Sequence, residues 1–297
     1  MKRLVRLVAY GLLTLVVLAV GVLGVAWWRM EAALDRVYTL ADVKLDVSGD
    51  PAQVERGRHL AVTRGCTDCH GDDLAGRVVI DAGPIGLYVA ANLTAAGAGM
   101  DANHFEHAVR HGVGRDGRPL RFMPATDFAG MGDDDVAALF AYVQSVPPAS
   151  KPLPETRIGP LGRVLYLFDQ IPVLITAEAV DHAAASAPRA APIAAATADY
   201  GRYLASGCTG CHGERFAGGR IPGAPPDLPI AANLTPDPSG LGAWSEADFM
   251  RAIRDGKRPD GSDIDPFMPW KSLGHMTDTE LRALYAYLRS LPPLPRG

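Results

Sequence analysis

All four cysteines of the chain belong to two copies of one pattern, C-x-x-C-H. The copies consist of Cys66, Cys69 and His70, and of Cys208, Cys211 and His212. This pattern joins two thiols to the vinyl groups of a heme and places the adjoining histidine to bind the iron. Cysteines at i and i+3 share one face at the start of a helix, which suits two vinyl carbons on one porphyrin edge. We therefore predict two covalently attached c-type hemes, with His70 and His212 as proximal iron ligands.

A structural zinc site, a redox-active cysteine pair and two disulfides are the alternative uses of such cysteines. Zinc ribbons usually keep their cysteine pairs about 15 to 20 residues apart, whereas Cys66 and Cys208 are separated by nearly half of the chain. A histidine directly after both pairs would also be rare by chance. Both observations favour heme.

A heme that only transfers electrons needs a second axial ligand, and a methionine thioether in that position raises the reduction potential. The segments Phe122-Met123-Pro124 and Phe267-Met268-Pro269 occupy matching positions after the two heme motifs, and the proline favours a loop. We predict Met123 and Met268 as the distal ligands. The competing histidines do not recur at matching positions; they are His59, His104, His107, His111, His182 and His275.

Further residues have candidate supporting roles around the hemes. The second ring nitrogen of each proximal histidine should donate to a backbone carbonyl, and Pro84 and Pro225 mark candidate loops for that acceptor. His107 and His111 are four residues apart on an expected helix; a surface metal site is one interpretation, and solvated polar side chains are the better one. The candidate donors to heme propionates, which have turn capping and solvent exposure as alternative roles, are Asn92, Asn233, Arg110 and Arg254.

The elements that must position these residues occur twice in the chain. Glu55–Ala61 matches Asp199–Ala205, and both predict an amphipathic helix that leads into the heme motif. The other matching pairs are Ala91–Thr94 with Ala232–Thr235, Phe105–Gly112 with Phe249–Gly256, Asp116-Gly117 with Asp260-Gly261, and Val136–Val143 with Leu281–Leu288. The pattern indicates an internal duplication of one heme domain.

The last helix of each copy has a recognisable start. Thr277 and Glu280 form a capping box, with Met276 placed as a hydrophobic staple against Leu281. The corresponding residues of the first copy are Met131, Gly132 and Asp135. This assigns Met131 and Met276 to packing rather than to iron.

An apolar segment precedes both copies. Lys2, Arg3 and Arg6 are followed by an uncharged run from Leu7 to Trp28, which as a helix would extend about 33 Å and cross a bilayer. A cleaved signal peptide has a shorter apolar region, of about 7 to 15 residues, and Trp27-Trp28 suits a membrane interface. We predict a retained single-pass anchor in the bacterial cytoplasmic (inner) membrane, with the basic N-terminus in the cytoplasm and the heme domains in the periplasm.

The 297 residues have room for two domains of ordinary size. We expect an anchor at 1–30, a spacer with a weak helical pattern at 31–50, heme domains at 51–148 and 198–297, and a linker at 149–197. The apolar part of the linker, Ile158–Ile175, is expected as an interdomain strap broken near Pro172, with membrane contact as the alternative; the alanine-rich part, Ala183–Ala198, is expected to be mobile. The net charge of -4 offers no support for nucleic-acid binding.

Each copy resembles a class I cytochrome c domain. The second resembles the heme domains in cytochrome c subunits of bacterial membrane-bound alcohol, aldehyde and gluconate dehydrogenases. The residues that carry this likeness are Ala232–Pro238, Trp244–Phe249, Pro259–Gly261, Phe267–Pro269 and Leu284–Leu288. The resemblance implies an all-α fold around each heme, with His70, Met123, His212 and Met268 as axial ligands. This chain has two heme domains where those subunits commonly have three, and an anchor at its N-terminus.

These features predict a membrane-anchored diheme electron carrier rather than an enzyme, with no small-molecule substrate. Its donor would be a dehydrogenase or a quinol-oxidising complex, and its acceptor an oxidase or a soluble cytochrome. One alternative is an electron-transfer subunit within a dehydrogenase or oxidase complex. A diheme peroxidase is another, and the matching methionines argue against its open iron position.

Overall fold

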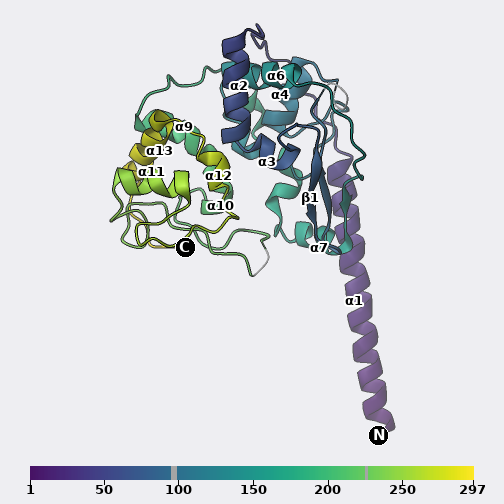
Figure 1. Cartoon of the computed structure of the whole chain (residues 1–297). Coiled ribbons are helices and arrows are strands. Elements are labelled where there is room, and N and C mark those ends of the chain that lie inside the picture. Colours follow the sequence, from purple (N-terminus) through teal and green to yellow (C-terminus); the bar gives the residue numbers. More distant parts are fainter. Residues whose placement is uncertain (95–98, 225–226) are drawn as a thin grey trace.

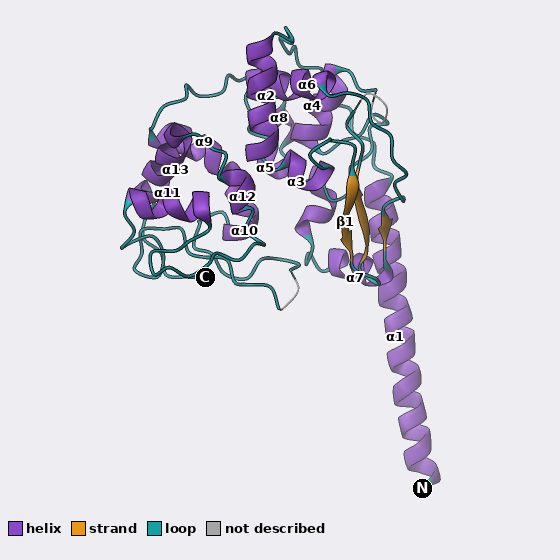
Figure 2. Cartoon of the chain, in the orientation of Figure 1, coloured by secondary structure: helices purple, strands orange, loops and turns teal. Residues whose placement is uncertain are grey.

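The computed structural model describes residues 1–94, 99–224 and 227–297. Two helical lobes lie side by side, and one long helix projects away from them (Figure 1). The fold is mostly helical, as predicted, with one small three-stranded sheet that was not predicted (Figure 2). The predicted linker joins the lobes, and part of it packs on the first.

The two lobes use corresponding helices in the same order. Those of the first lobe are α2 (Pro51–Thr63), α3 (Cys66–His70), α4 (Ala102–His111), α5 (Ala125–Phe128) and α6 (Asp133–Ser145). Those of the second are α9 (Ala198–Leu204), η2 (Ala205–Cys208), α10 (Thr209–His212), α11 (Glu246–Asp255), α12 (Trp270–Leu273) and α13 (Asp278–Ser290). The remaining elements are α1 (Lys2–Leu34), β1 (Arg77–Asp81), β2 (Gly86–Ala90), β3 (Arg157–Ile158), α7 (Pro160–Leu167), η1 (Pro172–Glu178) and α8 (His182–Ala185).

The first and last helices of each lobe cross at a glycine. A Cβ atom on Gly57 would lie 1.9 Å from the carbonyl oxygen of Ala138, and one on Gly201 would lie 1.9 Å from that of Ala283. Only a residue without a side chain permits this contact between α2 and α6, or between α9 and α13. The matching sequences therefore build the same helix crossing twice.

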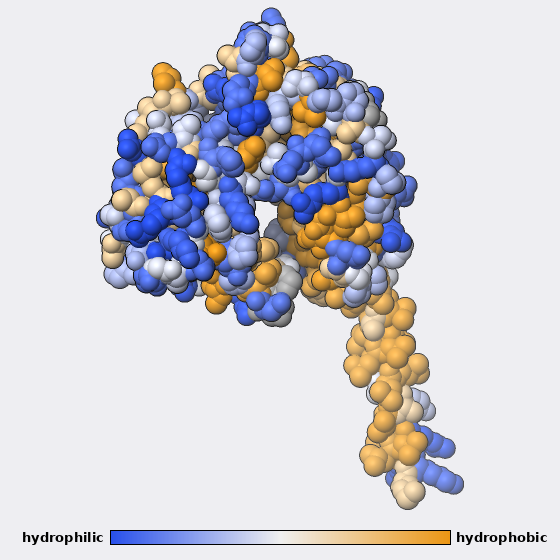
Figure 3. Space-filling model, in the orientation of Figure 1, coloured by the Kyte–Doolittle hydropathy of each residue, from blue (hydrophilic) through white to orange (hydrophobic). Residues whose placement is uncertain are grey.

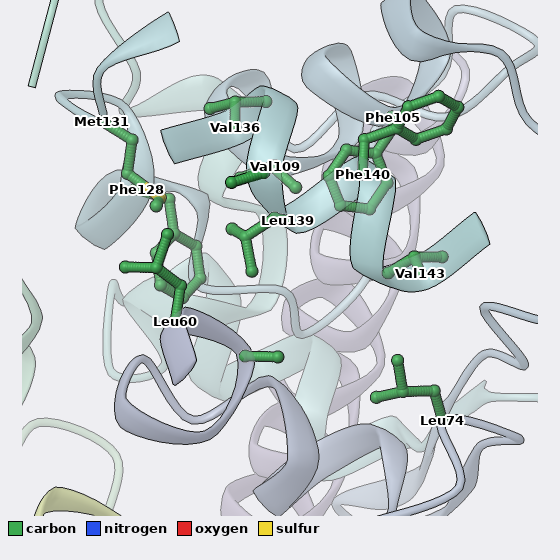
Figure 4. Packing of buried hydrophobic residues seen from close by; sticks show 12 residues of the cluster. Leu60, Leu74, Phe105, Val109, Phe128, Met131, Val136, Leu139, Phe140 and Val143 are labelled. Carbon is green, nitrogen blue, oxygen red and sulfur yellow. The ribbon is translucent and has the colours of Figure 1, made fainter. Parts of the chain in front are cut away.

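Apolar side chains from all these helices close the core of each lobe. In the first lobe Leu60, Leu139 and Phe140 pack with residues of α4 and α5 (Figure 4). Met131 and Met276 are buried in their respective cores, as their assignment to packing requires. The predicted capping box between Thr277 and Glu280 is present at the start of α13.

The first lobe carries an additional layer that has no counterpart among the described residues of the second. Strands β1, β2 and β3 form an antiparallel sheet in that order, and one apolar cluster joins Tyr88 of β2 to Tyr166 of α7, Leu174 of η1 and Met30 of α1. The predicted strap thus packs on the first lobe. The expected weak helix in the spacer is wrong beyond Leu34, because residues 36–50 form no helix.

Helix α1 is continuous from Lys2 to Leu34. Its N-terminal part is exposed and apolar, long enough to cross a membrane (Figure 3). Its C-terminal turns are buried against the first lobe through Ala26, Met30 and Ala33. One helix therefore joins the apolar segment directly to the additional layer of the first lobe.

Candidate heme sites

The first heme motif forms a short helix bounded by glycine at both ends, and the second forms a short helix that ends at Gly213. Gly65 precedes α3 with φ +76°, and Gly71 ends it with φ +83°, a region that favours glycine. Burial raises the pKa of Cys66 to about 12 and that of Cys208 to about 11. In the free-thiol form both cysteines are therefore neutral at pH 7, which argues against a thiolate redox pair.

Each motif histidine has the hydrogen bond expected of an iron ligand. The Nδ1 atom of His70 lies 2.8 Å from the carbonyl oxygen of Ala91, and that of His212 lies 2.8 Å from the carbonyl oxygen of Ala232. Burial lowers the pKa of both imidazoles, against the smaller effect of these bonds. A neutral ring that donates through Nδ1 keeps the lone pair on Nε2 for iron, so the residues fit a heme.

The carbonyl acceptors correct one sequence prediction. The loop at Pro84 does not supply the acceptor, because the carbonyl of Pro84 accepts from the backbone of Leu161 instead. Pro225 lies outside the described residues. The acceptors Ala91 and Ala232 begin the repeated Ala-Asn-Leu-Thr segments, and that repeat is the sequence signal that could have located them.

The asparagines of these repeats hold the acceptor loops in place. The Oδ1 atom of Asn92 accepts from the backbone nitrogen and hydroxyl of Thr94, while its Nδ2 donates to the carbonyl of Ala149 at 2.7 Å. Asn233 makes the same contacts with Thr235 and the carbonyl of Leu294. The turn-capping interpretation of both asparagines is therefore supported over propionate binding.

The two arginines considered for the propionates also have partners within the protein. Arg110 is fully buried and contacts Glu106 and Asp133. Arg254 donates to the carbonyl of Gly274 and pairs with Asp278. These contacts use the two guanidinium groups to join α4 to α6 in the first lobe and α11 to α13 in the second.

The two predicted distal methionines occupy matching loops. Met123 and Met268 are partly buried against the cores of their lobes, and a short helix follows each. The carbonyl of Met123 accepts from Ala125 at 2.8 Å, and that of Met268 accepts from Trp270 at 2.7 Å. The backbone around both residues is thus held alike.

The histidines outside the motifs form no second metal centre. No group of three or more histidine, cysteine or acidic side chains among residues 1–94, 99–224 and 227–297 is placed to hold a metal ion. The expectation that His111 is solvated is wrong: it is fully buried, with Nδ1 2.8 Å from that of His182 in α8. Its burial results from the linker, which covers this face of α4.

Comparison with known proteins identifies both lobes. The family model described as cytochrome c matches residues 54–147 and 198–292. The chain belongs to the cytochrome c family. With one C-x-x-C-H motif in each matched segment, this cytochrome carries two covalently bound c-type hemes.

Relatives extend the likeness across most of the chain. The cytochrome is 33% identical over 284 residues to the cytochrome c subunit of a quinone alcohol dehydrogenase from Gluconacetobacter polyoxogenes, covering 83% of this chain and 57% of the relative. It is 32% identical over 285 residues to the cytochrome c subunit of a gluconate 2-dehydrogenase from Pantoea cypripedii, with 83% and 61% coverage. A diheme c-type cytochrome from Cereibacter sphaeroides is 33% identical over 105 residues, with 32% and 36% coverage. The chain thus spans about three fifths of the length of the dehydrogenase subunits it matches.

The two heme domains of the cytochrome contact each other through equivalent residues. His59 of α2 lies 2.9 Å from both carboxylate oxygens of Glu280 in α13. At the corresponding positions, Tyr203 of α9 donates to Asp135 of α6. In each domain, a side chain of the first helix therefore contacts an acid in the first turn of the last helix of the other domain.

A second reciprocal contact involves the heme motifs. The hydroxyl of Ser272, in the helix after Met268, donates to Asp68 within the first motif at 2.5 Å. Asp127, in the helix after Met123, faces Gly210 within the second motif, with an oxygen 3.7 Å from where a Cβ would stand. The helix after each methionine loop thus packs on the heme motif of the other domain, which sequence analysis did not predict.

Proposed function

We propose that this cytochrome is the electron-transfer subunit of a membrane-bound dehydrogenase and relays single electrons through two His/Met-ligated hemes. The observation that carries the proposal is the likeness of the two sites. Each has a neutral histidine bonded to an alanine carbonyl, and a methionine in a matching loop. Two similar sites, each with a histidine and a methionine as candidate ligands, are better suited to electron transfer than to peroxidase activity. A peroxidase needs an iron with an open coordination position.

The protein groups prepare each site for that task. Bound heme supplies the one-electron chemistry. The bond from Nδ1 to the alanine carbonyl fixes the tautomer and orientation of the imidazole. A thioether ligand from Met123 or Met268 would favour the ferrous state and raise the reduction potential. With a thioether in the distal position of each heme, neither iron would keep an open coordination position for a substrate.

The reciprocal domain contacts support transfer within the molecule. Both heme motifs lie against the neighbouring domain, at Ser272 and at Asp127. The second heme is therefore present at a high effective concentration for the first, independent of diffusion. This arrangement favours a relay between the hemes.

The relatives favour the subunit over a free carrier. Those that match most of the chain are named as cytochrome c subunits of dehydrogenases. Helix α1 would anchor the cytochrome in the inner membrane, with Lys2, Arg3 and Arg6 in the cytoplasm and both domains in the periplasm. The electron donor would be the dehydrogenase partner, and the acceptor an oxidase or a soluble cytochrome.

Two measurements test this function. The full-length holoprotein should show two c hemes by pyridine hemochrome, and a ferric near-infrared Met-ligand band that Met123→Ala and Met268→Ala each halve. Carbon monoxide should bind only the variants, and Met250→Leu should behave as the wild type. Ready carbon monoxide binding by the wild type would favour a heme enzyme instead.

The partnership is tested separately by purification in mild detergent. A dehydrogenase subunit should accompany the cytochrome in constant proportion and reduce its hemes when given substrate. If the cytochrome purifies alone, with no flavoprotein or quinoprotein, the result would favour a free electron carrier over a dehydrogenase subunit.

A further inference from the structure

Three arginine side chains line one cavity beside the end of α1. Arg121 comes from the loop before Met123, Arg157 from β3 and Arg163 from α7. The cavity measures about 280 Å³. Its remaining lining comes from Glu31, Leu34, Thr156 and Ile158.

The positive charge of this cavity is only partly neutralised. Glu31 is the one carboxylate in the lining, and it pairs with Arg163 at 2.8 Å. Arg121 and Arg157 are exposed and make no ion pair within the described part of the chain. Three guanidinium groups and one carboxylate leave an excess of positive charge facing a cavity, which favours an anionic ligand.

Arg163 provides an independent indication of a ligand. Its side chain is buried, with only 9% of the residue exposed. Its Nε and Nη1 atoms have no aligned hydrogen-bond acceptor among the described residues, although Nη1 lies close to Glu31. Leaving buried donors unpaired costs free energy, and an anion in the cavity would supply the missing acceptors.

The cavity lies at the level where α1 would leave a bilayer. The guanidinium of Arg163 stacks over the ring of Trp27, 3.7 Å from its centroid. Tryptophan marks the membrane interface, and Glu31 lies about one helical turn beyond it. Helix α7 lies beside α1 (Figure 1). Leu161 of α7 and Phe168, which follows it, are exposed apolar side chains. Lipid headgroups occupy this depth.

We propose that this cavity binds the phosphate group of an anionic phospholipid. The planar guanidinium group matches phosphate oxygens in pairs, and such charge-assisted bonds are among the stronger hydrogen bonds. Glu31 holds Arg163 toward the cavity, and Arg121 and Arg157 close on the same anion from the loop and the sheet. The neighbouring apolar side chains would contact the acyl chains.

The test uses full-length holoprotein in a neutral detergent and dioctanoyl phosphatidylglycerol as the probe, followed by native mass spectrometry. Wild type should bind phosphatidylglycerol at least tenfold more tightly than dioctanoyl phosphatidylcholine. The variant Arg121→Gln/Arg157→Gln should lose that preference. Arg202→Gln/Arg251→Gln, which removes two exposed arginines with local ion pairs from the second domain, should retain it.

Three outcomes would overturn the lipid assignment. Equal affinity of the wild type for both lipids would remove the headgroup preference, and unchanged binding by Arg121→Gln/Arg157→Gln would place any lipid elsewhere. Inorganic phosphate that binds as tightly as phosphatidylglycerol and displaces it would identify a free-anion site instead. Because these measurements need no electron-transfer partner, their result is independent of the proposed dehydrogenase association.

Discussion

The two heme domains differ in what surrounds one shared helical scaffold. In the first, β1 and β2 form a hairpin between the heme motif and the acceptor loop. In the second, the described residues of the same stretch form only the isolated bridge between Gly219 and Ala231. The histidine geometry is nevertheless the same in both. The difference teaches that the helices and the acceptor loop suffice to build the heme site.

The additional layer of the first domain serves attachment. Its sheet, α7 and η1 pack with the last turns of α1 in one apolar cluster. The second domain has no contact of this kind with α1 among the described residues. It is held by the linker and by the reciprocal contacts across the domain interface.

The largest expected effect tests whether the two scaffolds are equivalent. Gly57→Ala and Gly201→Ala each place a Cβ 1.9 Å from a backbone oxygen, which neither helix can avoid without moving. We expect each to lower the free energy of unfolding by about 4 kcal/mol or more. Urea unfolding followed by heme absorption measures this loss. Gly130→Ala is the control, because its Cβ would meet only the side chain of Arg189, at an ordinary contact distance of 3.9 Å. A much smaller loss in one domain would show that its helix crossing is not needed.

The next effect tests the reciprocal contacts. His59→Ala leaves the nearly buried Glu280 without its partner across the interface, and Tyr203→Phe removes the hydroxyl that Asp135 and the backbone of Gly132 share. Each should cost about 2 to 3 kcal/mol, because a buried acid loses a hydrogen bond. Urea unfolding and small-angle X-ray scattering should show a less stable and more extended molecule. Unchanged scattering in both variants would assign domain packing to other contacts.

Acid should weaken the same contact in the wild type. Burial raises the pKa of Glu280, but hydrogen bonds from His59 and Thr277 outweigh it and leave the pKa below its ordinary value. A depressed pKa contributes stability above the ordinary range of glutamate and loses it as the pH falls through the folded value. The acid-induced loss measured by urea unfolding between pH 5 and pH 3 should therefore be smaller in Glu280→Gln than in wild type.

The smallest expected change in stability concerns the two contacts at the heme motifs, which Asp127 and Ser272 make. Burial raises the pKa of Asp127 to about 6, whereas Ser272 at the matching position carries no charge. The raised pKa means that stability falls as the pH rises from about 4 to about 6. Asp127→Asn should remove this loss and stabilise the protein by about 1 to 2 kcal/mol at pH 7. Two pKa units correspond to about 3 kcal/mol, and solvent screening of this partly exposed side chain reduces that value. An equal gain at pH 4 would contradict titration as the cause.

Local patterns predicted the parts of the structure that depend on neighbouring residues. The C-x-x-C-H motifs, the capping box at Thr277 and the buried Met276 each follow from spacings of a few residues. The assignment of Met123 and Met268 to iron rests on duplication and stays a prediction.

Long-range contacts could not be predicted in this way. His59 and Glu280 belong to different domains, and no local periodicity links them. The histidine acceptors are backbone carbonyls, which any residue type supplies, so Pro84 was a poor guide to their position. His111 was expected in solvent because its burial depends on α8, a linker segment distant in sequence.

The reciprocal contacts of His59 with Glu280 and of Tyr203 with Asp135 resemble a homodimer interface, in which one self-complementary surface meets its own copy. Two separate copies would occupy that arrangement only above a certain protein concentration. A single chain holds it at any dilution. Linking the copies also frees the halves to diverge, so that one could acquire the attachment to α1 while the other keeps its outer surface for a different neighbour.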